Sequence, residues 1–491
     1  MYRSRSKDNL TDDVLHYLSS ISQDQSSILY YDVLGSQAHS IMLYETNNIT
    51  VEELKKVLLA LDEANKNPDK ILTEGYEDIH EALEAFVIAK AGISAGGKMH
   101  TARSRNDQVV LDIRMKIRDD INNVCEALAK LIESLIERAK ESKSVPMPMY
   151  THLQQAQIGT FSHLLLSYAY ALMRDMERLY LTYGRINQSP LGACAIGGTS
   201  INIDRERTAV LLGFGSVVKN SVDATSSRDS FLEYVATLAI MASTLGRMAE
   251  DLILWSTTEF GYIELANEYS STSSAMPQKK NPDPLELTRA KAAIITGNMM
   301  TMLGIVKALP SGYSRDLQDL KPVLLDASTT ALDAVRIMSG IVSSLRMNDA
   351  RMCEAASKSY AVALDIAEQL FKKYSLPFRS THKIVGALVD KAAGMGNIPL
   401  AKLELSDIAT VLDEFNLDIK ADQILKIIKE MTPEKSLEVR RSSGSPNPQE
   451  QEEMIRWLSH GISNYKLGIG KRKKMVEGAF ENLEKTVNNY L

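Results

Sequence analysis

The sequence predicts an all-α protein built around a central bundle of long helices. Apolar residues recur every three or four positions over long stretches, as they do along one face of an amphipathic helix. No convincing alternation of apolar and polar residues indicates strands. At 491 residues the chain is too long for one compact core, so roughly two to four domains are expected.

The longest expected helix covers residues 107–144. Its apolar stripe runs from Val110 to Ala139 without an intervening Gly or Pro, and Pro146 follows its end. A helix of this length would be roughly 50 Å long. Gly, Pro and Asn clusters separate further long helices, which are expected at residues 157–183, 229–259, 283–308 and 322–346.

Shorter helices are expected on both sides of this bundle. Thr50 and Glu53 fit a capping box at the start of one of them. After residue 347 the pattern again indicates short helices, interrupted by a stretch at 440–453 that is expected to be a mobile loop. These limits predict an N-terminal helical domain (1–106), a central long-helix bundle domain (107–350) and a C-terminal helical domain (351–491). The long helices offer more apolar surface than one chain easily covers, so we expect oligomerisation.

Composition excludes several classes of function. Lys and Arg number 56 and Asp and Glu 62, a net charge of −6 that argues against general nucleic-acid binding. The basic run at 471–475 is expected to be a solvated helix start. Three scattered cysteines, no signal-peptide pattern and no apolar run of about 18 residues indicate the cytoplasm and no membrane span. No metal-spaced Cys/His set appears, so no metal is expected.

Polar segments at helix ends and in loops are the candidate functional sites. The segment "GGKMHTARSRNDQV" places Ser104, Arg105 and Asn106 before the longest helix, whose free N–H groups suit a carboxylate ligand. An alternative is that Ser104, Asn106 or Asp107 only caps the helix.

Two further segments offer an acid–base group and a cation. Thr151 and His152 follow a Pro-rich loop, and histidine is suited to proton transfer near neutral pH, although a lone histidine is more often structural. Arg228 could bind a carboxylate with both of its guanidinium N–H pairs. Alternatively it forms a surface ion pair with Asp229 or Glu233.

The stretch "STSSAMPQKKNPDP" (271–284) combines small hydroxyls, two ammonium groups and an amide. Ser273, Lys279 and Asn281 lie on it, and its prolines and lack of regular pattern predict a mobile catalytic loop. Such groups bind carboxylates and stabilise a developing oxyanion. A later segment, "GYSRDLQDLK", adds Tyr313, Gln318 and Lys321.

These segments together resemble a known family. "TSSAMPQKKNPD" is similar to the signature loop of the fumarase/aspartase superfamily of lyases. "GGKMHTARSRNDQV", "YTHLQQAQ", "DATSSRDSFLEY" and "MAEDLILWSTTEF" resemble segments of argininosuccinate lyases. The resemblance implies an all-α homotetramer whose active sites each draw on three subunits. It also implies reversible elimination of argininosuccinate to arginine and fumarate, the last step of arginine synthesis, without metal or organic cofactor.

The resemblance also implies roles for single residues. Ser273 resembles the serine that removes the Cβ proton, and His152 resembles the histidine paired with a glutamate, here Glu286. Lys279 and Asn281 match groups that hold the substrate carboxylates. Further substrate-binding positions are matched by Ser20, Ser104, Arg105, Asn106, Thr151, Arg228, Tyr313, Gln318 and Lys321.

Three alternatives stay open at this point. The chain could be another fumarate-releasing lyase of the superfamily, such as adenylosuccinate lyase, which a change of substrate would reveal. It could be a non-catalytic, crystallin-like homologue, although such a role requires none of Ser273, His152 or Lys279. It could also be a helical scaffold with polar loops, which would not explain why separate segments match one site.

Overall fold

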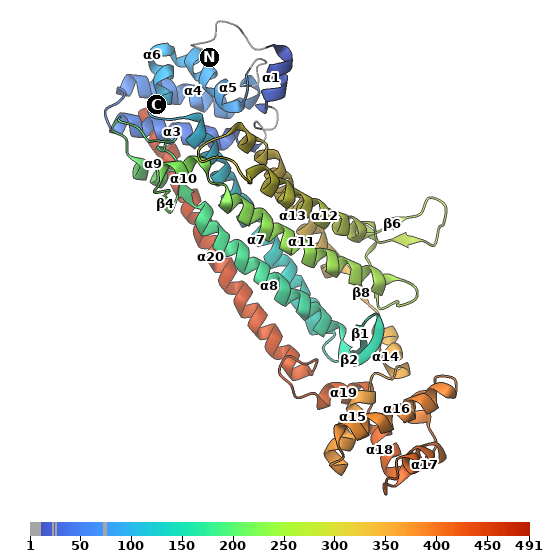
Figure 1. Cartoon of the computed structure of the whole chain (residues 1–491). Coiled ribbons are helices and arrows are strands. Elements are labelled where there is room, and N and C mark those ends of the chain that lie inside the picture. The colour runs from blue at the N-terminus through green and yellow to red at the C-terminus, as the bar shows by residue number, and fades with distance from the viewer. Residues whose placement is uncertain (1–10, 22–23, 25–26, 72–75) are drawn as a thin grey trace.

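Each of the five long helices predicted from apolar periodicity is present in the computed structural model, which describes residues 11–21, 24, 27–71 and 76–491. They run side by side as an elongated bundle (Figure 1). Within it α7 packs against α8 and α13, and α11 packs against α12. Their bounds are α7 (Arg105–Glu141), α8 (Phe161–Ile186), α11 (Asp229–Ser256), α12 (Asp283–Val306) and α13 (Leu320–Ser344).

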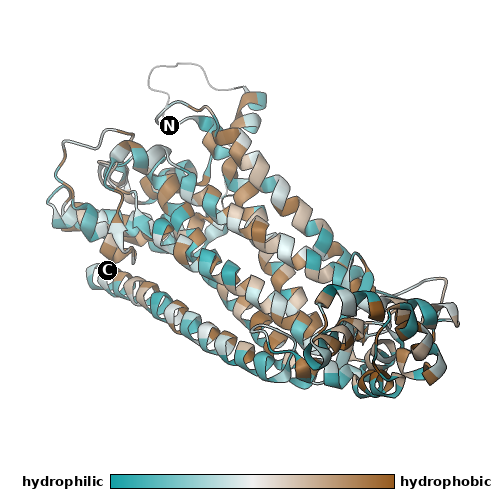
Figure 2. Cartoon of the chain, turned by 60° about the horizontal axis from the view of Figure 1, so that its bottom comes forward, coloured by the Kyte–Doolittle hydropathy of each residue, from teal (hydrophilic) through white to brown (hydrophobic). Residues whose placement is uncertain are grey.

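The core of the bundle is continuous along its length. Apolar and polar residues alternate around the long helices, as expected for amphipathic helices (Figure 2). Leu128 of α7, Phe161 of α8 and Leu238 of α11 belong to one buried cluster. Burying side chains of this size stabilises the fold by roughly 1.5–3 kcal/mol each. Helix α12 is less well covered, since four of its large apolar side chains are 40–64% exposed: Leu287, Ile294, Met300 and Leu303.

Short helices gather at the end of the bundle where α7 begins (Figure 1). The predicted capping box is confirmed, because Thr50 accepts from the Glu53 amide while Glu53 accepts from the Thr50 amide. The elements at this end are α1 (Asp12–Leu18), α3 (Leu29–Glu45), α4 (Val51–Lys66), η1 (Pro68–Lys70), α5 (Ile79–Ala91), α6 (Ile93–Gly96), η2 (Gly97–His100), α9 (Arg205–Leu211) and α10 (Ser221–Ser226).

The opposite end carries a second group of short helices with its own apolar core, which includes Ile366, Leu388 and Ile424. Its helices are α14 (Asp349–Lys358), α15 (Ala363–Tyr374), α16 (Phe378–Gly394), η5 (Leu400–Lys402), α17 (Leu405–Glu414), α18 (Ala421–Glu430) and α19 (Pro433–Val439).

The last helix, α20 (Pro448–Tyr490), was not predicted. It runs back along α7 and α8 and reaches α3 and α9 (Figure 1). The mobile loop expected at 440–453 is wrong for its second half, because α20 begins at Pro448. Asn447 fixes the preceding turn by donating from Nδ2 to the carbonyls of Leu437 and Glu438. The basic run at 471–475 lies inside α20, not at a helix start.

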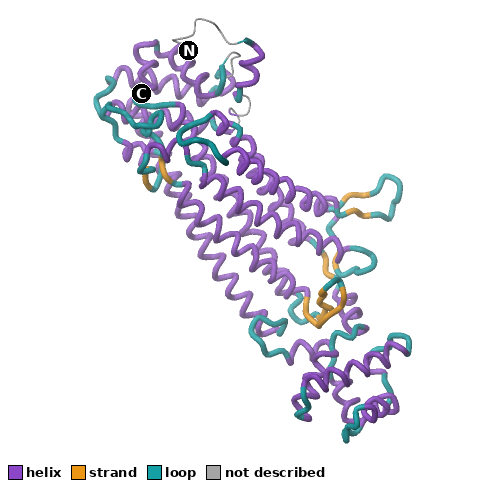
Figure 3. The backbone as a smooth tube through the Cα atoms, viewed as in Figure 1, coloured by secondary structure: helices purple, strands orange, loops and turns teal. Residues whose placement is uncertain are grey.

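Short strands lie where the long helices are joined (Figure 3). The helix predicted from residue 157 begins instead at Phe161, because Thr160 caps it and residues 154–160 pair as a strand. The pairs are β1 (Pro146–Thr151) with β2 (Gln154–Thr160), β3 (Gln188–Ser189) with β4 (Ser216–Val217), β5 (Ile263–Glu264) with β8 (Arg346–Met347), and β6 (Ser271–Thr272) with β7 (Lys280–Asn281). Two further 3-10 turns are η3 (Asn267–Tyr269) and η4 (Arg315–Gln318). Among the described helices, a stretch long and apolar enough to cross a membrane does not occur.

Candidate functional site

The predicted site residues fall into three groups at different places on the chain. The helix-end group lies around the start of α7 and contains Ser20, Ser104, Arg105, Asn106, Arg228, Tyr313, Gln318 and Lys321. The hairpin group is Thr151 and His152, at the turn between β1 and β2. The ribbon group is Ser273, Lys279, Asn281 and Glu286, on the β6–β7 ribbon and the start of α12.

The start of α7 is fixed by a capping box. The Ser104 hydroxyl accepts from the Asn106 amide, 3.3 Å away, and the Asp107 carboxylate accepts from the Ser104 amide, 2.9 Å away. Asn106 donates from Nδ2 to the Ala195 carbonyl at 2.9 Å. Ser104 and Asp107 therefore do cap the helix, and the Arg105 side chain takes no part in this capping box.

Asp107 also holds the loop that follows β3. Its second carboxylate oxygen accepts from the amides of Gly192 and Cys194, at 2.9 and 2.8 Å. Burial raises the pKa of Asp107 to about 6, against the lowering effect of these amides and of the Ser104 amide. The buried carboxylate thus joins the helix start to the 190–200 loop beside Asn106.

Acidic side chains that the sequence did not single out pair with the helix-end cations. Arg105 forms an ion pair with Asp78, the N-cap of α5. Lys321 forms an ion pair with Asp24, whose other oxygen accepts from the Ser20 hydroxyl at 2.7 Å. A recognisable signal for Asp24 was its position four residues after Ser20, one helical turn away.

Arg228 is a buried cation of the helix-end group. Arg228 is 2% exposed and donates to the carbonyls of Thr225 and Ser227, at 3.1 and 3.0 Å. The alternative of a surface ion pair is therefore wrong, because the side chain turns inward and Glu233 pairs with Arg185. Burial lowers the pKa of Arg228 to about 10, partly offset by Tyr313.

Gln318 links the group to the N-terminal segment. Its Nε2 donates to the Leu18 carbonyl at 3.1 Å, and Arg315 donates to the same carbonyl at 3.2 Å. Burial raises the pKa of Tyr313, while the cations Arg228 and Arg315 act in the opposite direction. The helix-end group is therefore rich in cations and amides, which suits an anionic ligand.

The hairpin group lies at the tip of the β1–β2 turn. Thr151 pairs with Gln154, which leaves His152 and Leu153 as a two-residue turn with φ values of 55° and 57°. Positive φ at both central positions matches a type I′ turn, which normally favours Asn-Gly. Non-glycine residues there cost on the order of 1 kcal/mol each. The turn holds the His152 side chain out into solvent.

The ribbon group presents Ser273 directly after β6. Its hydroxyl oxygen accepts from the amides of Ala275 and Met276, at 3.2 and 3.1 Å. Two converging backbone N–H groups stabilise negative charge on an oxygen. The loop between Ser273 and Lys279 is largely exposed.

Lys279 and Asn281 lie at the base of the ribbon. Both line a cavity of about 420 Å³, together with Lys280. Lys280 pairs with Glu264 at 3.0 Å. Glu286 is exposed on the first turn of α12.

One chain does not bring the three groups together. The helix-end group lies at the start of α7, and the hairpin follows its far end, so 37 residues of helix separate them, about 55 Å at 1.5 Å per residue. The β6–β7 ribbon projects from the side of the bundle (Figure 1). Among the described residues, His152 and Glu286 share no hydrogen bond or ion pair.

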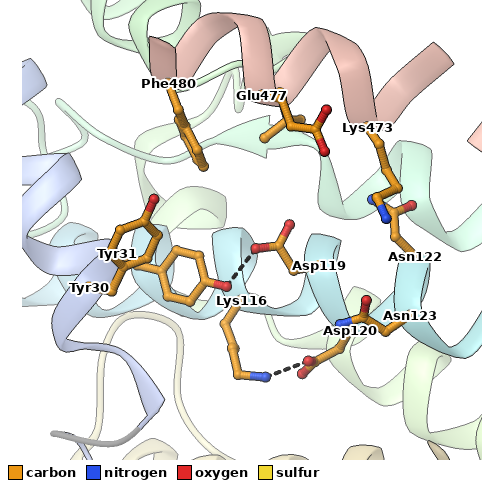
Figure 4. A pocket seen from close by; sticks show the side chains of 11 residues that line it. Tyr30, Tyr31, Lys116, Asp119, Asp120, Asn122, Asn123, Lys473, Glu477 and Phe480 are labelled. Carbon is orange, nitrogen blue, oxygen red and sulfur yellow. Dashed lines mark hydrogen bonds and ion pairs between the residues drawn. The ribbon is translucent and has the colours of Figure 1, made fainter. Parts of the chain in front are cut away.

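The cavity drawn in Figure 4 is a separate feature. It has a volume of about 360 Å³ and lies between α3, α7 and α20, where Tyr31 donates to Asp119 and Lys116 pairs with Asp120. It contains none of the predicted site residues, so it does not belong to the candidate site.

Comparisons with known proteins agree with this arrangement of motifs. A family described as "Lyase" matches residues 9–297, and a family described as "Argininosuccinate lyase C-terminal" matches residues 360–431. An argininosuccinate lyase of Nitrosopumilus maritimus is 48% identical over 491 residues and covers 100% of both chains. The chain belongs to the argininosuccinate lyase family. A second argininosuccinate lyase, of Methanocaldococcus jannaschii, is 39% identical with 98% of each chain covered.

Solved structures of other proteins share the fold of this argininosuccinate lyase family member. The structure of EDDS lyase in complex with formate superposes with a TM-score of 0.87 and 28% identity, and covers 98% of this chain and 96% of that chain. A class II fumarase from Schistosoma mansoni has a TM-score of 0.69 at 18% identity, with 82% and 90% covered, and shares the fold. The predicted all-α architecture is thereby confirmed.

Proposed function

We propose that the chain catalyses the reversible elimination of argininosuccinate to arginine and fumarate, as the last step of arginine synthesis. The observation that carries this proposal is the 48% identity over the whole length of an argininosuccinate lyase. The sequence contains the residues expected for this chemistry, Ser273, His152, Lys279 and Glu286. A cytoplasmic location is proposed separately, because the three cysteines are scattered and free.

Ser273 is the proposed base. The proton next to a carboxylate is weakly acidic, and a serine hydroxyl removes it only if the alkoxide is stabilised. The amides of Ala275 and Met276 already point at the Ser273 oxygen. Lys279 and Asn281 would stabilise the charge that develops on the substrate carboxylate, and closure of the ribbon would exclude water.

His152 is the proposed source of the proton for the departing guanidine, with Glu286 as its orienting partner. Imidazole has the proton affinity that this step needs near neutral pH. The helix-end cations Arg105, Arg228 and Lys321 would hold the anionic groups of the substrate.

Three chains are proposed to contribute to each site within a homotetramer. Groups about 55 Å apart along α7 cannot reach one small substrate from the same chain. The uncovered apolar face of α12, which includes Leu287 and Met300, fits burial against another copy.

The decisive experiment measures fumarate release from argininosuccinate and, separately, from adenylosuccinate. The Ser273→Ala variant is compared with Ser274→Ala. Ser274 is the neighbouring serine, and the Ala275 and Met276 amides donate to Ser273 instead. We expect fumarate from argininosuccinate alone, lost on substitution of Ser273 and retained on substitution of Ser274. Fumarate from adenylosuccinate alone would assign the chain a different lyase activity. Release from neither would leave a non-catalytic homologue.

A further inference from the structure

The loop that follows β3 contacts two parts of the helix-end group. Asn106 donates from Nδ2 to the Ala195 carbonyl at 2.9 Å. The next side chain, Ile196, lies against Gly312, since a Cβ at Gly312 would be 3.0 Å from Ile196 Cδ1. Gly312 directly precedes Tyr313. The tip of the loop therefore touches one predicted substrate-binding residue and the neighbour of another.

A carboxylate holds the base of this loop by its amides. Asp107 Oδ2 accepts from the backbone N–H groups of Gly192 and Cys194, at 2.9 and 2.8 Å. Both residues have a positive φ, 85° for Gly192 and 55° for Cys194. A cysteine keeps such a backbone conformation only where the surrounding contacts impose it. Asp107 is 0% exposed, so water does not compete for these bonds, and the second of them fixes the residue directly before Ala195.

A guanidinium holds the same segment by its carbonyls. Arg205 donates from Nε to the Leu191 carbonyl at 2.8 Å and from Nη2 to the Pro190 carbonyl at 3.2 Å. A Cβ at Gly192 would be 2.6 Å from Arg205 Cγ, so glycine lets the turn approach the arginine closely. An acidic and a basic side chain thus bind opposite polar groups of residues 190–194 and set the position of the loop against the start of α7.

The contact with Ala195 decides which way the Asn106 amide faces. A carbonyl accepts hydrogen bonds and cannot donate them, so the NH2 group of Asn106, and not Oδ1, must face Ala195. If the Ala195 carbonyl moved away, the amide would be free to turn over about its last bond, which is a broad, roughly two-fold torsion. Its oxygen and nitrogen would then exchange places at the substrate. The position of the loop therefore determines which groups of Asn106 a substrate meets.

We propose that Asp107 and Arg205 are positioning residues of the lyase reaction, which hold residues 190–194 so that the Ala195 carbonyl orients Asn106 toward the substrate. Neither side chain is proposed to touch the substrate, since both act through the backbone of the loop. The inference rests on the proposed function for the identity of the substrate and for Asn106 as one of its ligands.

Kinetics in two backgrounds test the path from the loop to the substrate. Arg205→Met removes both donors to the loop, keeps the alkyl stem and leaves the capping box of α7 intact. We expect KM for argininosuccinate to rise about fivefold with kcat within about twofold, because binding of the ground state and of the transition state weakens equally. Asn106→Ala alone should raise KM about tenfold or more. Adding Arg205→Met to Asn106→Ala should raise KM by less than about twofold further, because the side chain that the loop orients is gone.

The matched control is Arg351→Met. Arg351 also donates from its guanidinium to two consecutive carbonyls, those of Phe260 at 3.0 Å and Glu259 at 3.1 Å, but in a loop that does not contact Asn106 among the described residues. Its effect on KM should be the same with and without Asn106→Ala. Suppression of the Arg351→Met effect by Asn106→Ala would overturn the proposal, because the suppression would not be specific to the 190–194 loop.

Three results with Arg205→Met would also overturn it. An unchanged KM would mean that the loop does not affect substrate binding. An equal rise in KM in both backgrounds would mean that the loop acts on a group other than Asn106. A fall in kcat at constant KM would place the effect in the chemical step. Should Arg205→Met not fold, Gly192→Ala displaces the same contact from the loop side, and the same KM pattern is expected.

Hydrogen exchange of the loop gives a readout that needs no activity. Backbone amides of residues 190–200 should exchange faster in Arg205→Met and in Asp107→Ala than in the wild type, and Arg351→Met should leave them unchanged. Unchanged exchange in either of the first two variants would show that the substituted side chain does not hold the loop. If the wild type releases no fumarate from argininosuccinate while the loop still exchanges faster in both variants, the proposed function has failed and the holding of the loop has not.

Discussion

Mixing two inactive variants tests whether the site is shared between chains. Ser273→Ala removes the base of the ribbon group and His152→Gln removes the imidazole of the hairpin group, so each variant alone should be inactive. In hybrids of the two, a site works only when its ribbon comes from a His152→Gln chain and its hairpin from a Ser273→Ala chain. The ribbon and hairpin lie on different parts of one chain, so independent donors give about one quarter of wild-type activity for equal random mixing.

The assay is fumarate release by hybrids that are co-expressed with two different affinity tags and purified through both. The matched control mixes Ser273→Ala with Lys279→Ala, which both damage the ribbon, so every ribbon in the hybrid stays defective and no activity should return. Hybrids of the first kind that contain both chains and still release no fumarate would refute the shared site. Activity in the purified Ser273→Ala protein would refute the role of the base.

Three further outcomes follow from burial and backbone geometry. Met300→Glu should dissociate the assembly in sedimentation velocity because Met300 is 64% exposed on the apolar face of α12, whereas Leu467→Glu, on α20 and 65% exposed, should not; dissociation by both, or by neither, would contradict this. Asp107 has a folded-state pKa of about 6, above its unfolded value. Its contribution to the free energy of unfolding therefore falls by about 3 kcal/mol as the pH rises from about 4 to 6. The free energy of unfolding in urea, measured for the wild type and for Asp107→Asn, should differ between the two proteins by an amount that falls in the same way over this pH range. Leu153→Gly should raise the free energy of unfolding by about 1 kcal/mol, because φ at residue 153 is 57°. A lower free energy of unfolding for this variant in urea titrations would show that the backbone at this turn is not strained.

The long helices were predictable because their signal is local and repeated. Each turn of α7 or α8 adds another apolar residue to the same stripe, so the pattern accumulates over many turns. Helix α20 was not predicted because its buried positions are widely spaced, from Ile469 to Val476 and then Leu483, amid many charged residues. The hairpin at 146–160 was not predicted because its turn contains His152 and Leu153 and not the usual Asn-Gly.

The candidate site was predictable only in part. Residues in motifs, such as Ser273 and Arg105, could be recognised from their segments. Their partners could not, because Asp78 contacts Arg105 across 27 positions and Asp24 contacts Lys321 across nearly 300. Pairing at such separations depends on how the helices pack, and a single sequence has no periodicity that reports it.

The return of α20 to the start of the bundle sets an order for biosynthesis. Leu483 and Val487 share one apolar cluster with Tyr31 and Leu111. The region around Tyr31 therefore lacks part of its core until Leu483 and Val487 have been translated. At about 5–20 residues per second, the early helices wait for tens of seconds with apolar surface uncovered. A stop codon ahead of Leu483 would leave that surface open permanently, at the end of the bundle that carries the helix-end group.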